Sequence, residues 1–343
     1  MRMSIETPQP TAPEDNESAE TAEEGEIRSI RYFPVTMLAG ILSFFGTGLA
    51  WEIAAPAFGL PILVAKIFIG FGLGYALAVI GLYVARQTRH PSSLREDLCH
   101  PRRGNFLAAA PLGLLMIIEA FASHFDKIAD SIWLIACLAT MVICAMILNQ
   151  WLSRRFRPEE VSPAWFLPSS GLLIIPITGA PLGYPDISWM FAAAGILLWL
   201  GLFPITLNRL LFCRALSPVL MPDLFLLIVP PTLASIAITR LNGGYMDDMA
   251  IAFLGFALLV FVFFLPRLRR FKDVPFGMPW WCCSLSLGFL ATACMYYFDH
   301  TGYLAAGILA GAMLLISTAA TVAITLLSLS AFARGKMFRG PKS

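Results

Sequence analysis

Charged residues are scarce in this chain of 343 residues, because Asp, Glu, Lys and Arg together make up only 13% of it. A soluble domain usually carries ~25%. The sequence also has no G-x-S-x-G, H-E-x-x-H or Walker motif, and it contains only four histidines. These absences exclude an ordinary soluble core and argue against an enzyme. We expect no nucleic-acid partner.

The seven cysteines are an odd number, and no two of them form a C-x-x-C pair. Most fall inside apolar runs, where cysteine behaves as a small apolar residue. Cys99 and His100, with His90 nearby, do not have the spacing of a zinc site. We therefore expect no bound metal and no other cofactor.

Long apolar runs are what the chain has instead, since 58% of its residues are hydrophobic. Ten of these runs approach the ~20 residues that a helix needs to cross a ~30 Å hydrocarbon core. They are residues 33–51, 61–84, 105–123, 131–152, 164–180, 187–207, 221–240, 249–266, 279–297 and 303–332. The runs are continuous, without period-two alternation, so they predict helices and not a barrel. The expected fold is an all-α polytopic membrane domain over residues 32–334.

Basic residues are distributed unevenly between the links. Of the 24 Lys and Arg residues, 21 fall in the two tails or in the even-numbered links, and the exceptions are Lys66, Lys127 and Arg240. Basic residues that flank membrane helices stay in the cytoplasm. The pattern predicts a multi-pass protein of the bacterial inner membrane with both termini cytoplasmic. Residues 1–31 would form a disordered acidic tail and residues 335–343 a basic one.

Short links make consecutive helices antiparallel neighbours, which predicts five helical hairpins. The odd-numbered helices carry most of the internal prolines, including Pro111, Pro176 and Pro230. Proline frees a carbonyl, and in a membrane this is tolerated only against protein or a water-filled cavity. We therefore expect the odd helices to form an inner ring around a pore. The alternative is that these prolines reflect only the general frequency of proline in membrane helices.

Two ionisable residues, Lys66 and Glu119, fall inside the expected spans at similar depth. Buried charges in a membrane suggest a functional site, here one in the outer vestibule. A structural ion pair, or a lysine that extends to the interface, is the alternative. Asp223 begins the seventh span, where a carboxylate is expected to cap the helix.

Several motifs occur in a characteristic order: FPVT at 33–36, HPRRGNF at 100–106, PAWFLP at 163–168 with IIP at 174–176, PP at 230–231 and PWW at 279–281. Together they resemble the tellurite-resistance/dicarboxylate transporter family, which includes the plant slow-type anion channels. The resemblance covers the whole membrane region. It implies ten helices in five hairpins, a central pore lined by odd helices, a homotrimer surrounded by lipid, and passage of small inorganic anions or dicarboxylates.

The family typically carries a Trp-Trp-x-x-Ser-Phe-Pro run in the ninth helix, in which the phenylalanine blocks the pore. Here Leu285 stands in place of that phenylalanine and Ser286 in place of the proline, so Leu285 is the expected gate. Leucine can close a narrow pore by dewetting, and Phe44 or Phe45 could assist it. The remaining candidates for the pore lining are Phe106, Ser284 and Ser286, together with the three prolines named above; Ser169 and Ser170 could also offer hydroxyls.

The sequence thus predicts an anion channel, or a channel-like transporter, with a hydrophobic gate. A proton-coupled exporter of dicarboxylate, sulfite or tellurite is the alternative, and it needs a titratable group in the path. A membrane scaffold without flux is a third interpretation.

Overall fold

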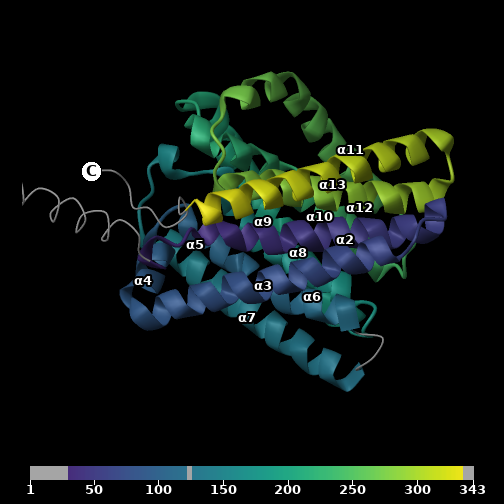
Figure 1. Ribbon diagram of the computed structural model, residues 1–343, viewed down its shortest axis with the longest axis horizontal. Coiled ribbons are helices and arrows are strands. Elements are labelled where there is room, and N and C mark those ends of the chain that lie inside the picture. The colour runs from purple at the N-terminus through teal and green to yellow at the C-terminus, as the bar shows by residue number, and fades with distance from the viewer. Residues whose placement is uncertain (1–29, 122–125, 335–343) are drawn as a thin grey trace, which may run out of the picture.

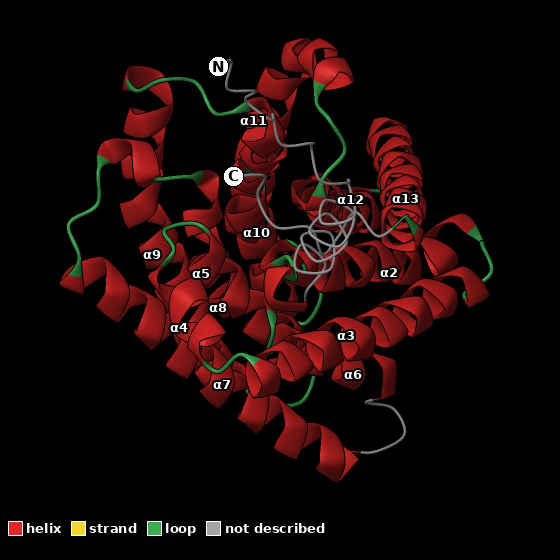
Figure 2. Ribbon diagram, turned by 60° about the vertical axis from the view of Figure 1, so that its left-hand side comes forward, coloured by secondary structure: helices red, strands yellow, loops and turns green. Residues whose placement is uncertain are grey.

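The computed structural model describes residues 30–121 and 126–334, and the regular structure in these ranges is entirely helical, as predicted (Figure 2). The main helices are α2 (Leu38–Phe58), α3 (Leu63–Arg89), α6 (Leu112–Phe121), α7 (Asp126–Ser153), α8 (Leu167–Gly179), α9 (Pro185–Phe212), α10 (Val229–Leu241), α11 (Asp248–Phe264), α12 (Trp281–Thr301) and α13 (Leu304–Ala333). The predicted tails lie outside the described residues, except for Ile30 and Arg31.

Eight helical stretches of the described chain are long and apolar enough to cross a membrane. They contain α2, α3, α7, α9, α10, α11, α12 and α13. The third and fifth expected spans are not among them. The third is divided into α5 (Arg103–Phe106), the 3₁₀ turn η3 (Leu107–Ala109) and α6, with a turn at Pro111. The fifth, Pro163–Gly179, is a shorter apolar helix.

Burial separates the membrane-length stretches into two groups. In the stretches that contain α2, α10 and α12, 83%, 83% and 89% of the most apolar window is buried inside the protein. In those that contain α3, α7, α9, α11 and α13, the buried share is between 17% and 33%. The shorter α8 is buried along its whole length. The first group therefore forms the core, and the second covers it with apolar outer faces.

Successive helices pack against each other, namely α2 with α3, α6 with α7, α8 with α9, α10 with α11 and α12 with α13. The most extensive contact in the protein is between α2 and α12, which are distant in sequence but adjacent in space (Figure 1). Helix α13 lies along both of them. The first and the last of the main helices are therefore joined within one helical bundle.

Each buried helix is preceded by a 3₁₀ segment. These segments are η2 (Val35–Met37), η3, η5 (Pro163–Phe166), η6 (Pro218–Leu227) and η8 (Met278–Trp280). Pro163, Pro218 and Pro279 stand in the first turn of their segments, where the missing N–H of proline has no helical partner to lose. The same local design is thus repeated at five points along the chain.

The contact between α2 and α12 depends on two glycines. A Cβ atom at Gly46 would lie 2.9 Å from the backbone nitrogen of Phe289, and one at Gly288 would lie 2.9 Å from the backbone nitrogen of Thr47. Because both obstacles are backbone atoms, neither can move without displacing a helix. Small residues of this kind allow membrane helices to approach closely.

We expect Gly288→Ala to destabilise the protein by about 1–3 kcal/mol, which is typical of overpacking. Thermal unfolding in detergent measures the effect. Gly311→Ala on α13 is the matched control, because a Cβ atom there meets nothing within 4 Å. Equal melting temperatures for the two variants would show that the helix contact tolerates the added methyl group.

Candidate functional site: an apolar ring above a buried ion pair

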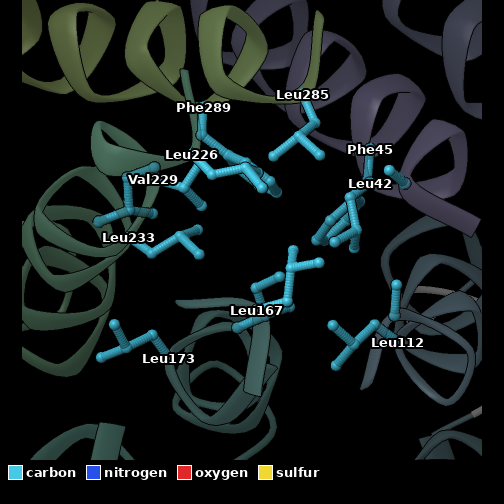
Figure 3. Packing of buried hydrophobic residues seen from close by; sticks show 14 of the residues in the cluster. Leu42, Phe45, Leu112, Leu167, Leu173, Leu226, Val229, Leu233, Leu285 and Phe289 are labelled. Carbon is cyan, nitrogen blue, oxygen red and sulfur yellow. The ribbon is translucent and has the colours of Figure 1, made fainter. Parts of the chain in front are cut away.

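Side chains from the buried helices gather around a common centre, but Leu173 turns away from it toward Gly195 of α9, where an added Cβ would lie 2.7 Å from the Cγ of Leu173 (Figure 3). The labelled residues are Leu42 and Phe45 of α2, Leu112 of α6, Leu167 and Leu173 of α8, Leu226 of η6, Val229 and Leu233 of α10, and Leu285 and Phe289 of α12. None of these side chains is more than 2% exposed. We call the set without Leu173 the apolar ring. It contains no polar atom on its side chains, so anything at its centre meets only hydrocarbon.

Leu285, the gate expected from the sequence, belongs to the apolar ring and is fully buried. Phe45 does as well, and its ring meets that of Phe289 edge to face, with 6.2 Å between the centroids. Phe289 was not predicted. It lies one helical turn beyond Leu285, so the 3.6-residue period of α12 places it on the same face. That period was the signal that could have identified it.

Hydroxyl groups fix the orientation of α12 behind the ring. Ser284 shares hydrogen bonds with Ser43 of α2 and with Thr321 of α13, the latter at 2.7 Å. Thr321 also bonds to Thr47 at 2.9 Å. Since Ser284 directly precedes Leu285, this buried network sets the rotation of α12 that turns Leu285 toward the centre.

The other serines predicted for the pore also have partners within the protein. Ser286 donates to the carbonyl oxygens of Phe225 and Cys282, at 2.9 and 2.7 Å. Ser169 and Ser170 both donate to the carbonyl of Phe166, at 2.8 Å. These bonds occupy the hydroxyl protons, so an anion would have to displace a carbonyl to receive one.

Among the predicted aromatic residues, Phe44 packs against Tyr75 of α3 and Trp281, with centroids 5.4 and 5.8 Å away. These contacts place its ring on the α3 side of α2. Phe106 is fully buried, and the guanidinium carbon of Arg102 lies 5.0 Å from its ring centroid. The prolines lie where the helices begin or bend: Pro111 in the turn before α6, Pro176 within α8, and Pro230 in the first turn of α10.

Of the two predicted intramembrane charges, Lys66 is exposed on α3. The side chain of Glu119 lies outside the described residues, so their proposed pairing stays a prediction.

A buried ion pair closes the end of the bundle where the core helices begin. Asp223 is fully buried and accepts hydrogen bonds from Nε and Nη2 of Arg102, the second at 2.7 Å. The expected capping role of Asp223 is therefore wrong, since its side chain makes no cap in η6. Its carboxylate instead neutralises the charge of Arg102, which comes from a distant segment of the chain.

A second acid, Asp97 of α4 (Ser92–Cys99), joins the neighbouring segments. It is fully buried, pairs with Arg86 of α3 through both carboxylate oxygens, and lies 3.5 Å from Nη1 of Arg103. Arg86 also donates to the carbonyl of Arg31 at 2.8 Å. The adjacent arginines of the HPRRGNF motif thus have different partners, and together they anchor the entry to the third span.

His100 of the same motif acts as a hydrogen-bond acceptor. Its Nδ1 accepts the backbone N–H groups of Arg102 and Arg103, both at 3.2 Å. Burial lowers the pKa of His100 below its ordinary value of 6.5, and the positive charges of Arg103 and Arg102 lower it further. The neutral form is therefore the one that the fold stabilises.

This shift predicts that acid weakens the fold. Because the folded pKa is depressed, the contribution of neutral His100 to stability is complete above pH ~6.5 and is lost as the pH falls below that value. We expect His100→Asn to flatten this dependence, since the asparagine oxygen can accept the same N–H groups without titrating. Melting temperatures between pH 5 and 8 test the prediction. If the melting temperature falls with pH equally in the variant and in the unaltered protein, the prediction is wrong.

Comparison with known proteins agrees with this architecture. Residues 30–329 match the family model described as voltage-dependent anion channel, SLAC1. The chain belongs to this family, which confirms the resemblance seen in the sequence.

Among individual relatives, the chain is 23% identical over 300 residues to the S-type anion channel SLAH2 of Arabidopsis thaliana, covering 85% of this chain and 58% of the relative. It is 22% identical over 222 residues to a tellurite resistance protein TehA homolog of Haemophilus influenzae, covering 63% and 66%. An uncharacterised transporter of Methanocaldococcus jannaschii is 21% identical over 73% of this chain and 82% of the relative. The chain spans about half the length of the plant relatives SLAH2 and SLAH3.

Proposed function

We propose that this protein is a transmembrane anion channel, or a channel-like transporter, that passes small anions between its buried helices. One observation carries the proposal: apolar side chains from α2, α6, α8, η6, α10 and α12 gather around one centre, inside a bundle whose outer helices are apolar toward the surroundings. Membership of the SLAC1 family gives the passage its ligand class.

In this proposal the chain crosses the membrane ten times, as five hairpins with the odd spans inside. The five packed pairs of successive helices support it, as do the five 3₁₀ entries and the alternation of burial. The divided third span and the shorter fifth would be sheltered from lipid by the outer helices, as membrane-embedded turns must be.

The outer helices would face lipid. Large apolar side chains on them are strongly exposed, such as Phe71 at 70%, Leu138 at 66% and Leu304 at 80%. The bias of basic residues supports cytoplasmic termini, and we propose the bacterial inner membrane as the location. We propose the homotrimer on the family resemblance alone.

The apolar ring would be the barrier to flow. An anion entering it must shed water without gaining a polar partner, so the free-energy barrier is high while the ring is tight. Leu285, Phe45 and Phe289 together would form the narrowest part. Opening would require only small displacements of side chains from different helices.

Flux from liposomes tests the function. Purified protein should release chloride, nitrate, sulfite or malate down a concentration gradient, and an imposed pH gradient should not change the rate. Flux that requires a pH gradient would favour the proton-coupled exporter. No flux of any of the four anions would leave the scaffold interpretation.

A further inference from the structure

A pocket of about 540 Å³ lies between the C-terminal part of α9 and the segment that joins α7 to α8. Its polar side is formed by Arg157, just before the 3₁₀ turn η4 (Pro158–Glu160), and by Asn208 and Arg209 of α9. The other lining residues are Phe156, Pro158, Val161, Trp165, Pro204 and Ile205. None of them belongs to the apolar ring, so this pocket is separate from the proposed passage. Its size is in the range of ligand-binding pockets.

Arg209 is a buried cation on the wall of this pocket. Only 6% of it is exposed, and no carboxylate of the described chain lies within ion-pair distance. Its Nη1 donates to the carbonyl oxygen of Arg214 at 2.9 Å, while its Nε is shielded from solvent without a partner. A cation in the last turn of α9 complements the helix dipole, which explains the bond to Arg214. It does not explain a buried charge without a counter-ion, which costs free energy.

The other well-buried arginines show how the fold otherwise treats such a charge. Arg86 binds both oxygens of the fully buried Asp97. Arg102 binds both oxygens of the fully buried Asp223. In each case the chain supplies a carboxylate, whereas for Arg209 the described residues supply a pocket.

The charge around the pocket is also positive. Arg157 is exposed and forms no ion pair with a described residue. The two acids of η4 do not line the pocket. Glu159 is exposed, and the carboxylate of Glu160 accepts bonds from Arg154 and from the backbone N–H of Arg157, both at 3.0 Å. The polar side therefore presents two guanidinium groups and an amide, which suit an oxyanion such as a phosphate.

The apolar side of the pocket indicates what the anion is attached to. Trp165 stacks on Trp151, with 4.6 Å between centroids, and its Nε1 already donates to the carbonyl of Pro101. Its ring thus offers the pocket only apolar surface. Ile205 is 50% exposed and continues the apolar outer face of α9. In the proposed topology this end of α9 faces the cytoplasm, where basic pockets between membrane helices bind anionic lipid headgroups.

We propose that this pocket binds the phosphodiester headgroup of an anionic phospholipid, with Arg209 and Arg157 as its cationic partners and Asn208 as a neutral donor. The glycerol and the first acyl carbons of the lipid would lie against Trp165 and Ile205. The site requires the chain to lie in a membrane with the proposed orientation. It does not require an anion to cross that membrane, so binding alone tests it.

The test measures lipid binding by the full-length protein in an uncharged detergent. Phosphatidylglycerol should raise the melting temperature by mass action, and native mass spectrometry should show this lipid retained on the protein. Phosphatidylcholine has the same phosphodiester but no net charge, and inorganic phosphate has the charge but no apolar part. Each should stabilise the protein much less than phosphatidylglycerol at the same concentration.

Substitutions on the polar side should weaken this binding. For Arg209→Gln we expect the half-saturating concentration of phosphatidylglycerol to rise about tenfold or more, because a hydrogen-bonded charge is lost. Arg157→Gln should raise it about fivefold, the usual effect of one basic residue on an anionic lipid. Asn208→Asp should also weaken binding by placing a negative charge in the pocket. Since Asn208 is exposed, this variant decides the matter if Arg209→Gln does not fold.

Arg155→Gln is the matched control, because Arg155 is an exposed arginine of the same segment that does not line the pocket. It should weaken binding clearly less than Arg157→Gln does. Equal weakening by the two would show a diffuse effect of surface charge and would overturn the proposal.

The remaining outcomes separate the possible ligands. If inorganic phosphate stabilises the protein as well as phosphatidylglycerol does, the pocket takes free anions and the lipid assignment is wrong. Equal stabilisation by phosphatidylcholine would show a general effect of lipid and would also overturn the site. If phosphatidylglycerol binds through Arg209 but no anion crosses the bilayer of liposomes, the site stands and the proposed function fails.

Discussion

Replacing Leu285 by alanine is expected to raise nitrate flux about tenfold or more, because a barrier lowered by only 1.4 kcal/mol has that effect. The substitution removes three carbons from the tightest part of the apolar ring. The wider space admits water, and a hydrated passage lowers the desolvation barrier for the anion. Initial rates of efflux from liposomes measure the change.

The matched control for this experiment is Leu287→Ala. Leu287 is also buried on α12, but it lies two residues further along and therefore on a different face of the helix. Both variants lose packing, which costs about 2–5 kcal/mol for a buried leucine, so folding must be verified for each. Higher flux in both variants would indicate that any loss of packing around α12 makes the bilayer leaky to nitrate. Unchanged flux in Leu285→Ala would refute the assignment of the gate.

Phe45 and Phe289 could seal the ring even without Leu285, because their rings meet edge to face across α2 and α12. In that case Phe289→Ala combined with Leu285→Ala would open a passage that Leu285→Ala alone does not. The combination therefore separates a gate of one residue from a gate shared by three.

The second large effect is expected at the buried ion pair. Asp223→Asn should destabilise the protein by about 3–5 kcal/mol, because it leaves the charge of Arg102 buried without its counter-charge. The amide can accept only one of the two bonds that Asp223 receives. Unfolding in mixed micelles gives the free-energy difference.

An exposed pair from the same side of the bundle provides the control. Arg154 and Glu160 are 3.0 Å apart, with 43% and 27% of their side chains exposed. Glu160→Gln should therefore cost less than about 1 kcal/mol. Replacing both buried partners, Arg102→Met with Asp223→Leu, should recover much of the stability lost in Asp223→Asn. If Asp223→Asn were as mild as Glu160→Gln, the pair would have no structural role.

The all-α fold and the division into buried and outer helices could be predicted from the sequence, because both depend on local properties. Apolar runs determine which segments enter a membrane, and proline positions indicate which of them need shelter. The ring position of Leu285 followed from a motif match. These predictions required no knowledge of which helices touch.

The charged ends could not be predicted in this way. The partner of Asp223 is 121 residues away, and no local pattern indicates such a pairing. Glu52 was missed for a different reason. The sequence predicts the first span over residues 33–51, whereas α2 continues to Phe58 and includes Glu52. The predicted spans therefore contain Glu119 but not Glu52, although α2 also carries an acid.

The most direct test of the central claim is the accessibility of a cysteine placed at the ring. In a variant whose native cysteines have been replaced, Leu285→Cys should react with a small, membrane-impermeant anionic thiosulfonate, and the reaction should block nitrate flux. Leu287→Cys should remain unreactive. If Leu285→Cys reacts only with lipid-soluble reagents, the ring is not on a path that ions can reach, and the account of the passage is wrong.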